Sequence, residues 1–326
     1  MASRPPKVSI GLPVYDGENF LSQALDSLLA QSFTDFEVIV SDNGSTDRTR
    51  EICASYAARD PRISVVRVED NLGAAYNFNR VFELSSGQYF KWMAHDDLIA
   101  PDFLARCVDI LDRDPSIVLC FSKVVVIDGQ GQQVDEYSIG LDTDNAKPGR
   151  RFRSLLIDWH MCFDVFGLIR TEALGRMPVM GNYGHADGVL LARLGLIGRF
   201  HNIPEALFFS RRHQEQSMRV YGYSVDEGGN DYHAYAAWFD PSRSNKLVFP
   251  QWRILGEYYK LAWLPNLTLH TRVESHLYVF WWAIKARRHL LSDVLHAGRS
   301  IIGRVVSIKR SFSADRKSTI SHPRDQ

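Results

Sequence analysis

Two adjacent carboxylates, Asp96 and Asp97, directly follow the hydrophobic stretch that ends at Trp92-Met93. Carboxylate oxygens are the ligands that Mg²⁺ and Mn²⁺ prefer. A cation held there would stabilise a diphosphate leaving group, whose negative charge grows as the bond to it breaks. The alternative is that the two acids begin a solvated helix before Pro101, where acidic residues are ordinary. Their place after a predicted core strand favours a functional role.

Carboxylates also occur in two earlier segments, Pro13 to Glu18 and Asp42 to Asp47, and each of these follows a predicted strand. In a parallel sheet, ligands bind beyond the carboxyl ends of the strands. We therefore expect both segments and Ala94 to Asp97 to line one ligand site. Asp47 is the exception, because its position favours capping of the next helix.

The elements that position these segments are short β-branched runs alternating with helical patterns. That order predicts an α/β fold, a parallel sheet covered by helices. The predicted strands are Val8 to Leu12, Phe36 to Ser41, Ile63 to Val68, Tyr89 to Met93 and Ile117 to Phe121. For residues 128–182, which have Gly-rich turns and a polar stretch, we predict loops.

Composition narrows the class of protein. The 326 residues include 38 basic and 38 acidic side chains, so the formal charge is zero and no nucleic-acid partner is expected. The N-terminus lacks the apolar run of a secretory signal, and the run Leu277 to Ile284 is far shorter than the ~20 residues that span a bilayer. We expect a cytoplasmic protein with reduced thiols, because the cysteines lack metal-ligand spacing and suit core packing: Cys53, Cys107, Cys120 and Cys162.

Several motifs occur in order along the chain: Pro13-Val14-Tyr15-Asp16, Val40-Ser41-Asp42-Asn43-Gly44-Ser45-Thr46-Asp47, Asn71-Leu72-Gly73, Gly184-His185-Ala186-Asp187 and Ile203-Pro204-Glu205 to His213. Together they resemble the motifs of the family 2 inverting glycosyltransferases, which have the GT-A fold, and the first is similar to that family's Pro-x-Tyr-Asn. The resemblance covers about Val8 to Ser217. It implies a Rossmann-like, mostly parallel central sheet flanked by helices.

Carried onto these positions, the resemblance implies a nucleotide-sugar donor site. Pro13 and Tyr15 would lie at the nucleotide base, Asp42 would accept from its imide N–H, Asp96 would lie at the ribose or donor sugar, and Asp97 would bind Mg²⁺ or Mn²⁺. The family's acidic triplet begins with another Asp where this chain has Ala94.

Three further residues each have a possible role in donor binding and a structural alternative. Glu18 either contacts the nucleotide or stabilises the first turn of its helix through the helix dipole. Asn71 either approaches the diphosphate or only forms a turn with Gly73. Arg80 is either a diphosphate contact or a solvated helical charge.

The resemblance also implies the catalytic base. Asp187 would take the proton of an acceptor hydroxyl that attacks the anomeric carbon from the face opposite the diphosphate, which inverts the configuration. His213 would either complete the metal site, because neutral imidazole commonly binds metals, or contact the diphosphate. Beside it, Arg211 and Arg212 are either phosphate ligands or a surface charge pair.

The pattern changes after the resemblance ends. We predict a catalytic domain over residues 1–220 and a helical, basic extension over residues 221–326. From Lys285 to the end, ten Lys or Arg stand against three Asp. Aromatic residues around Trp281 precede this basic stretch, so the segment is either a packed helix with a solvated end or a peripheral contact with the inner face of the cell membrane.

These patterns predict an inverting glycosyltransferase whose donor is a nucleotide diphosphate sugar, with UDP the leading candidate. The acceptor would be a glycan, a glycolipid or another lipid-linked or small molecule. One alternative is a catalytically inactive nucleotide-sugar or glycan-binding protein that keeps the fold. A sugar-nucleotide pyrophosphorylase fits less well, because Gly11 to Tyr15 lacks a Gly-rich, basic phosphate loop.

Overall fold

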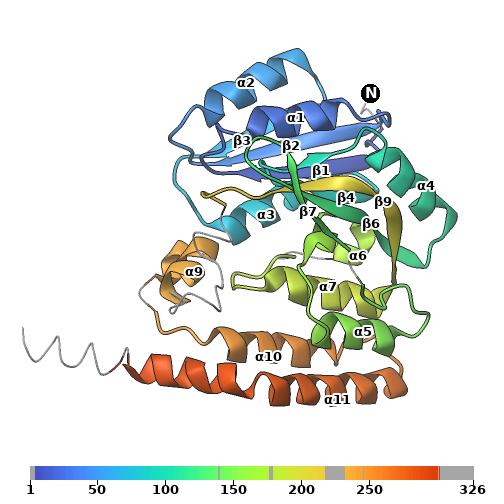
Figure 1. Cartoon of the computed structure of the whole chain (residues 1–326), viewed down its shortest axis with the longest axis vertical. Coiled ribbons are helices and arrows are strands. Elements are labelled where there is room, and N and C mark those ends of the chain that lie inside the picture. The colour runs from blue at the N-terminus through green and yellow to red at the C-terminus, as the bar shows by residue number, and fades with distance from the viewer. Residues whose placement is uncertain are drawn as a thin grey trace, which may run out of the picture.

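A computed structural model of the chain describes residues 4–138, 140–175, 179–216, 232–244, 246–299 and 301. Its centre is one curled sheet with the strand order β3-β2-β1-β4-β8-β6-β9-β5, and β7 pairs with β6 (Figure 1). The strands are β1 (Val8–Val14), β2 (Phe36–Asn43), β3 (Ile63–Val68), β4 (Tyr89–Trp92), β5 (Leu98–Ile99), β6 (Ile117–Ile127), β7 (Gln133–Tyr137), β8 (Leu168–Arg170) and β9 (Arg199–Arg211).

Most of this sheet is parallel. Strands β3, β2, β1 and β4 run in one direction, and β6 and β9 share it because β8 is antiparallel to both β4 and β6. Strands β5, β7 and β8 run the other way. The expected α/β fold class, with a Rossmann-like and mostly parallel central sheet, is therefore confirmed. All five strands predicted from the sequence are present, and β1, β2 and β6 continue beyond the predicted ends.

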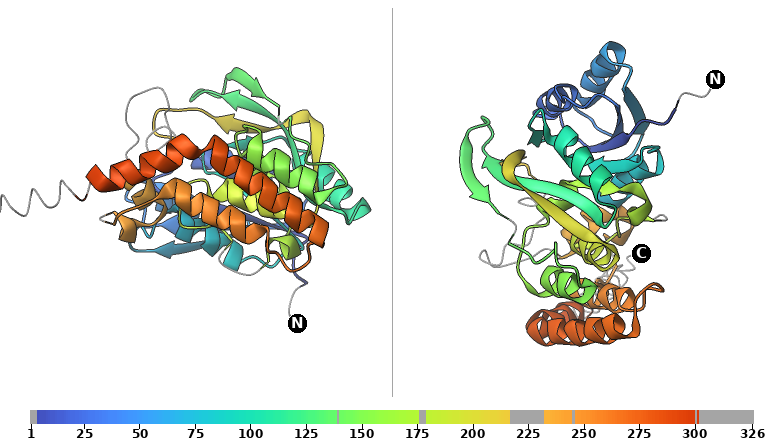
Figure 2. Two further views of the ribbon diagram at one scale, coloured as in Figure 1. Left: turned by 90° about the horizontal axis from the view of Figure 1, so that it is seen from below. Right: turned by 90° about the vertical axis from the view of Figure 1, so that its right-hand side faces the viewer.

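Helices cover both faces of the sheet (Figures 1 and 2). One buried cluster joins β1 and β2 to helices α1, α2 and α4, and another joins the opposite face to α3, α5 and α7. The described helices are α1 (Leu21–Leu29), α2 (Thr49–Arg59), α3 (Ala74–Glu83), α4 (Phe103–Arg113), α5 (Pro148–Ile157), η1 (Phe163–Phe166), α6 (Thr171–Leu174), α7 (Ala186–Ile197), α9 (Tyr232–Phe239), η2 (Pro241–Arg243), α10 (Pro250–Leu261) and α11 (Leu269–Lys285), followed by helical residues 287–299.

Alternation along the strands explains the two layers. Side chains of successive residues in a strand point to opposite faces. Tyr89 of β4 therefore joins the cluster under α1, α2 and α4, whereas Phe90 and Trp92 join the cluster under α3 and α7.

The prediction of loops over residues 128–182 was wrong in part, because β7, α5, η1, β8 and α6 lie there. These short, mixed elements lack a long periodic pattern.

The C-terminal helices pack on this second layer. Ile254, Tyr258 and Leu261 of α10 and Val279 of α11 are buried in the same cluster as α7. Helix α11 forms the outermost layer, as the view from below in Figure 2 shows. The predicted helical character of the C-terminal part agrees with α9, α10 and α11, while the boundary predicted near residue 220 and the basic residues after 301 lie outside the described residues.

One buried cation stands out in the core. Lys91 of β4 is fully buried and its ammonium donates to the carbonyl oxygen of Phe166. The ammonium also lies 4.6 Å from the ring centre of Phe103 and 5.2 Å from that of Phe208. Burial lowers the pKa of Lys91 to about 7, although Cys107 and Asp97 act in the opposite direction. The charged form is therefore destabilised in the folded protein.

We expect Lys91→Met to raise the stability of the protein at pH 6, because an apolar side chain of similar length avoids burying the charge. In the unfolded chain the lysine stays protonated up to its ordinary pKa, whereas the folded chain loses the proton near pH 7. Between these values the unfolded state binds more protons, so the wild type gains stability as pH rises. Urea unfolding at pH 6 and pH 9 should show the advantage of the variant shrinking; an advantage that grows with pH would contradict this.

Candidate functional site

The loops after β1 and β2 hold each other in place at the carboxyl edge of the sheet. Asp16, with a positive φ of 48°, accepts from the backbone N–H of Thr46 at 2.8 Å. Glu18 accepts from the backbone N–H of Arg48 at 3.1 Å, and Asp47 accepts from the N–H groups of Glu18 and Thr49, each at 2.9 Å. Glu18 and Asp47 thus cap the start of α2 reciprocally. The capping role expected for Asp47 is confirmed, and Glu18 serves α2 rather than its own helix.

Asp42 sits beneath an arginine at this edge. Its side chain is 1% exposed, and one carboxylate oxygen accepts from the backbone N–H of Ser45 at 2.9 Å. The other oxygen forms an ion pair with Arg67, which stands directly opposite in the β2–β3 register and also donates to the carbonyl of Ser45 at 3.1 Å. Tyr15 is exposed nearby after β1, while Pro13 is buried in that strand. No motif in the sequence had singled out Arg67.

The two carboxylates after β4 are buried together. Asp96 lies 3.0 Å from Nε2 of His213, whose ring packs on Phe20 with centres 4.8 Å apart. Burial acts to raise the pKa of Asp96, but the hydrogen bond to His213 and the nearby charges of His95 and His213 outweigh it, so the pKa is lowered. Burial and then the charge of Asp96 raise the pKa of Asp97 well above its usual value.

Arg211 organises this pair from within. It is fully buried, its backbone N–H donates to Asp97 at 2.8 Å, and its Nε donates to the carbonyl of Asp96 at 2.8 Å. The remaining guanidinium nitrogens reach the carbonyl of Asp128 and the side chain of Gln23. The surface reading of Arg211 was therefore wrong, whereas Arg212 is exposed.

Asn71 and Arg80 do not join the carboxylates. The side-chain oxygen of Asn71 accepts from the side chain of Asn43 and from the backbone N–H of Gly73, each at 2.9 Å, and so shapes the turn before α3. Arg80 lies in the last turn of α3 and pairs with Glu83 at 3.1 Å. Both contacts correspond to the structural alternatives for these residues.

The loop that precedes α7 gathers a second set of side chains. Asp187 lies in the first turn of α7, and its neighbour His185 has a left-handed backbone with φ of 65°. Nε2 of His185 lies 3.0 Å from the hydroxyl of Tyr258, and Nδ1 lies 3.9 Å from Asp187. The thiol of Cys162 lies close to both, with the ligand atoms of Cys162, His185 and Asp187 all within 4.8 Å of one another. The expectation that Cys162 only packs in the core was therefore incomplete. Cys162 is partly buried and lies beside His185 and Asp187, which are distant from it in the sequence.

Helix α9 connects the two sets. A Cβ added to Gly73, at the start of α3, would lie 2.6 Å from the carbonyl oxygen of Phe239, so α9 packs closely on that turn. One turn earlier in α9, the ring of Tyr235 packs directly on Gly184, where an added Cβ would overlap it. Four helical residues span only about 6 Å. The turn at Gly73 and the loop that carries Asp187 therefore contact the same short helix.

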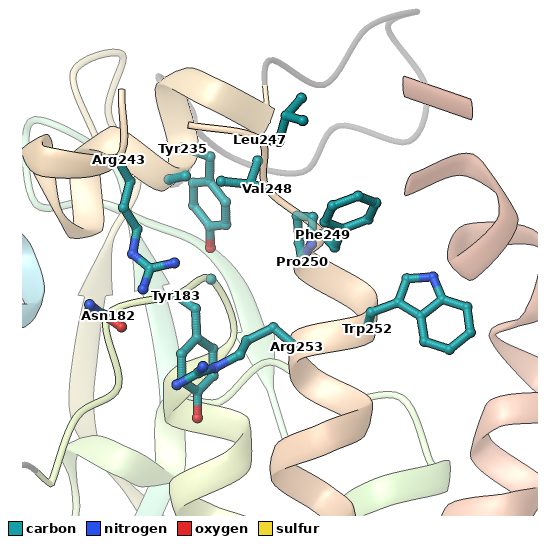
Figure 3. A pocket seen from close by; sticks show the side chains of 12 residues that line it. Asn182, Tyr183, Tyr235, Arg243, Leu247, Val248, Phe249, Pro250, Trp252 and Arg253 are labelled. Atoms are coloured by element: carbon teal, nitrogen blue, oxygen red, sulfur yellow. The ribbon is translucent and has the colours of Figure 1, made fainter. Parts of the chain in front are cut away.

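A cavity of about 360 Å³ opens beside the loop that precedes α7 (Figure 3). Aromatic residues and two arginines line it, drawn from that loop, α9, η2 and the start of α10. Figure 3 shows Arg243 beside Asn182 and Arg253 across the ring of Tyr183. The guanidinium carbon of Arg253 lies 5.2 Å from that ring centre. The lining thus offers flat apolar faces and cationic groups side by side. The motifs did not reveal it, because half of it comes from the C-terminal helices.

The residues after β4 fit a divalent cation by their chemistry. Asp96 and Asp97 are two adjacent buried carboxylates, and their mutual repulsion contributes to the raised pKa of Asp97. Mg²⁺ characteristically binds one or two carboxylates and completes its coordination with substrate phosphates. His213 contacts Asp96, and no described contact joins it to Asp97.

Comparison with known proteins identifies the fold and the family of the chain. The solved structure of S. aureus TarS 1–349 in complex with UDP-GlcNAc superposes with a TM-score of 0.58, covering 90% of this chain and 81% of TarS at 14% identity. That likeness shows the GT-A fold. Residues 9–177 match the sequence model described as Glycosyl transferase family 2.

Relatives agree with this match. A Rickettsia prowazekii protein named an uncharacterized glycosyltransferase is 35% identical over 226 residues, covering 66% of this chain and 67% of the relative. A Rickettsia typhi protein with the same description is 36% identical over 123 residues, 37% of each chain. The match thus spans little more than a third of the length of the latter. The chain belongs to glycosyl transferase family 2, a family of transferases.

We expect Arg67→Met to destabilise the protein by about 2 to 3 kcal/mol, because it leaves the buried carboxylate of Asp42 without its cation. This loss of stability is smaller than that expected for a fully buried ion pair, because Arg67 itself is 26% exposed. Arg62→Met is the matched control: Arg62 is 28% exposed, but its partner Asp60 is far more accessible than Asp42. Urea unfolding of both variants should give the larger loss for Arg67→Met, and equal losses would contradict the ion pair's structural importance.

Proposed function

We propose that the protein is an inverting glycosyltransferase that moves a sugar from a nucleotide diphosphate donor, UDP-sugar first among the candidates, to an acceptor hydroxyl. The observation that carries this proposal is the arrangement of two polar sites on one short helix, α9. On one side lies the turn at Gly73 with the donor loops, and on the other lies the loop that carries Asp187. A transferase needs a donor and a base at such close quarters.

On the donor side, the base of the nucleotide would lie on the exposed ring of Tyr15, above Pro13. Asp42 would accept from an imide N–H in addition to its bonds from Ser45 and Arg67, since a carboxylate has about four acceptor positions. Arg67 would donate to a neighbouring base carbonyl. Asp96 would bind the ribose or the donor sugar. That S. aureus TarS was solved with UDP-GlcNAc supports UDP as the first nucleotide to try. Glu18, Asn71 and Arg80 would act indirectly, through the loops and helix they stabilise.

Asp97, with Asp96 and His213 beside it, would hold Mg²⁺ or Mn²⁺. When bound, such a cation supplies positive charge to the departing diphosphate. Arg211 would keep both carboxylates in place through its hydrogen bonds to Asp97 and to the carbonyl of Asp96.

On the acceptor side, Asp187 would accept the proton of the attacking hydroxyl. The new bond forms between that oxygen and the anomeric carbon while the bond to the diphosphate oxygen breaks, and the proton ends on the carboxylate of Asp187. Attack from the opposite face inverts the anomeric centre. The acceptor would occupy the cavity beside this loop, with sugar rings against Tyr183 or Trp252 and polar groups at Arg243 and Arg253.

The proposal is tested by nucleotide release from UDP-, dTDP- and GDP-sugars with Mg²⁺ or Mn²⁺. One donor should be turned over, chelation should abolish release, and Asp97→Asn should lower it about 10²-fold because stabilisation of the leaving group is lost. Asp187→Asn should lower acceptor-dependent transfer by about 10² to 10⁴-fold while leaving donor affinity intact, as expected for loss of a general base.

Asp109→Asn is the matched control, since Asp109 forms only a surface ion pair with Arg113 on α4. Calorimetry with each donor separates the alternatives. Tight binding without turnover in the presence of varied acceptors would identify a catalytically inactive binding protein, and no binding to any nucleotide sugar would refute the proposal. Release of nucleoside triphosphate from donor plus pyrophosphate would indicate a pyrophosphorylase.

The outer face of the C-terminal helices supports a peripheral membrane contact at the inner face of the cell membrane, suited to a lipid-linked acceptor. Exposed apolar side chains recur every three or four residues along α11 and continue into residues 287–299. Among them, Leu269 is 78% exposed and Phe280 is 65% exposed. The full set is Leu269, Val273, Leu277, Phe280, Ile284, Leu291 and Leu295. Exposed Lys285, Arg287 and Arg288 interrupt this stripe. Apolar and basic groups together suit an anionic bilayer surface. Of the described helices, none is long and apolar enough to cross a bilayer.

Co-sedimentation with vesicles tests this contact. The protein should bind phosphatidylglycerol vesicles more than phosphatidylcholine vesicles, and Leu277→Ser with Phe280→Ser should release it because the apolar contact is lost. High salt should weaken binding through screening. Val65→Ser is the control, an exposed apolar residue on β3. Absence of binding together with a dimer that the same two substitutions dissociate would assign the stripe to a second copy instead.

A further inference from the structure

Three side chains of metal-binding type converge at the start of α7. Ligand atoms of Cys162, His185 and Asp187 all lie within 4.8 Å of one another, and each residue is partly buried. Within the part of the chain that the structure describes, this is the one group of three such residues with that closeness. The donor-side residues Asp96, Asp97 and His213 do not form a comparable group.

The surroundings of His185 prepare it as a ligand. Its Nε2 lies 3.0 Å from the hydroxyl of Tyr258, a fully buried side chain of α10, and its Nδ1 faces Asp187 at 3.9 Å. A metal-binding histidine characteristically uses its second nitrogen in such a hydrogen bond, which fixes the tautomer and the ring orientation. Nδ1 is thereby the nitrogen available to a metal ion.

A second observation comes from buried polar atoms next to the cluster. Both carboxylate oxygens of Asp164, two residues after Cys162, are completely buried and have no hydrogen-bond partner among the described residues. Nε2 of His160, two residues before Cys162, is in the same condition. Buried polar atoms are nearly always paired, so unpaired ones point to a missing water or ion. The two residues that carry them, His160 and Asp164, flank Cys162 in the sequence.

We propose that Cys162, His185 and Asp187 form a binding site for a thiophilic divalent cation such as Zn²⁺, distinct from the Mg²⁺ or Mn²⁺ position at Asp97. A thiolate with an imidazole selects Zn²⁺ or Co²⁺ over Mg²⁺, which prefers oxygen ligands alone. Bond lengths of about 2.0 to 2.3 Å in a tetrahedral site require the three ligand atoms to approach by roughly 1 Å. On binding, the thiol of Cys162 releases its proton to solvent as its sulfur bonds to the metal.

The consequence for the enzyme follows from Asp187. A carboxylate bound to a metal ion is no longer free to accept a proton from an acceptor hydroxyl, so occupancy inhibits transfer. This consequence rests on the proposed base, whereas metal binding itself does not. Inhibition by Zn²⁺ would then coexist with activation by Mg²⁺ or Mn²⁺.

The site is tested with the full chain, stripped by chelator dialysis and kept reduced with a phosphine. Titration with Co²⁺ in excess Mg²⁺ should produce the near-ultraviolet thiolate-to-cobalt band and the visible bands of tetrahedral Co²⁺, and Zn²⁺ should abolish both by displacement. Cys162→Ser should lose the thiolate band, and His185→Asn should weaken Co²⁺ binding at least about tenfold. Tyr258→Phe should weaken it about tenfold through loss of the hydrogen bond to His185.

Cys53→Ser and His270→Asn are the controls, a buried cysteine of α2 and an exposed histidine of α11, and both should keep the spectrum. Urea unfolding confirms that each variant is folded. A folded wild-type protein without a thiolate band, or a band that persists in Cys162→Ser, overturns the site. Zn²⁺ inhibition, expressed relative to each variant's own metal-free rate, should be lost in Cys162→Ser. A Co²⁺ band without Zn²⁺ inhibition would support the metal site and overturn Asp187 as the base.

Discussion

The whole donor edge depends on burying carboxylates together with hydrogen-bond partners. Asp42, Asp96 and Asp97 are almost completely withdrawn from water at the ends of β2 and β4. An unpaired charge in such a place is very costly, so each acid needs a partner. Arg67 forms an ion pair with Asp42 from the neighbouring strand. At the end of β9, the backbone N–H of Arg211 donates to Asp97, and His213, two residues further on, contacts Asp96. These partners come from strands far apart in the chain, and the sheet is what brings them together.

This arrangement explains why β9 is long and buried at its end. The strand pairs with β6 along most of its length. Its last residue, Arg211, is fully buried and hydrogen-bonds to Asp96 and Asp97. The reciprocal capping between the β1 and β2 loops serves the same purpose, because side-chain carboxylates there accept hydrogen bonds from backbone N–H groups and close the edge beside Asp42. The donor edge contrasts with the neighbourhood of Asp187, where the oxygens of Asp164 have no hydrogen-bond partner among the described residues.

The C-terminal helices belong to the site as well as to the core. Tyr258 of α10 orients His185, Tyr235 of α9 contacts the same loop, and the start of α10 closes the cavity. A chain ending after β9 would lose all three contacts. The apolar outer face of α11, in contrast, does not contact the site. Nothing in the described part of the chain covers this face, and its side chains remain exposed.

The sequence by itself determined the α/β class, the five strands from Val8 to Phe121 and the candidates Asp42, Asp96, Asp97 and Asp187, because periodic hydrophobicity and short ordered motifs are local signals. It also indicated that Asp47 caps a helix. Only the tertiary structure decided that Arg67 covers Asp42, that Arg211 is buried rather than a surface charge, and that Cys162 lies against Asp187. Contacts between residues separated by tens of positions leave no period and no spacing in the chain. Their geometry is decided by strand register and by the packing of α7, α9 and α10, which local patterns do not encode.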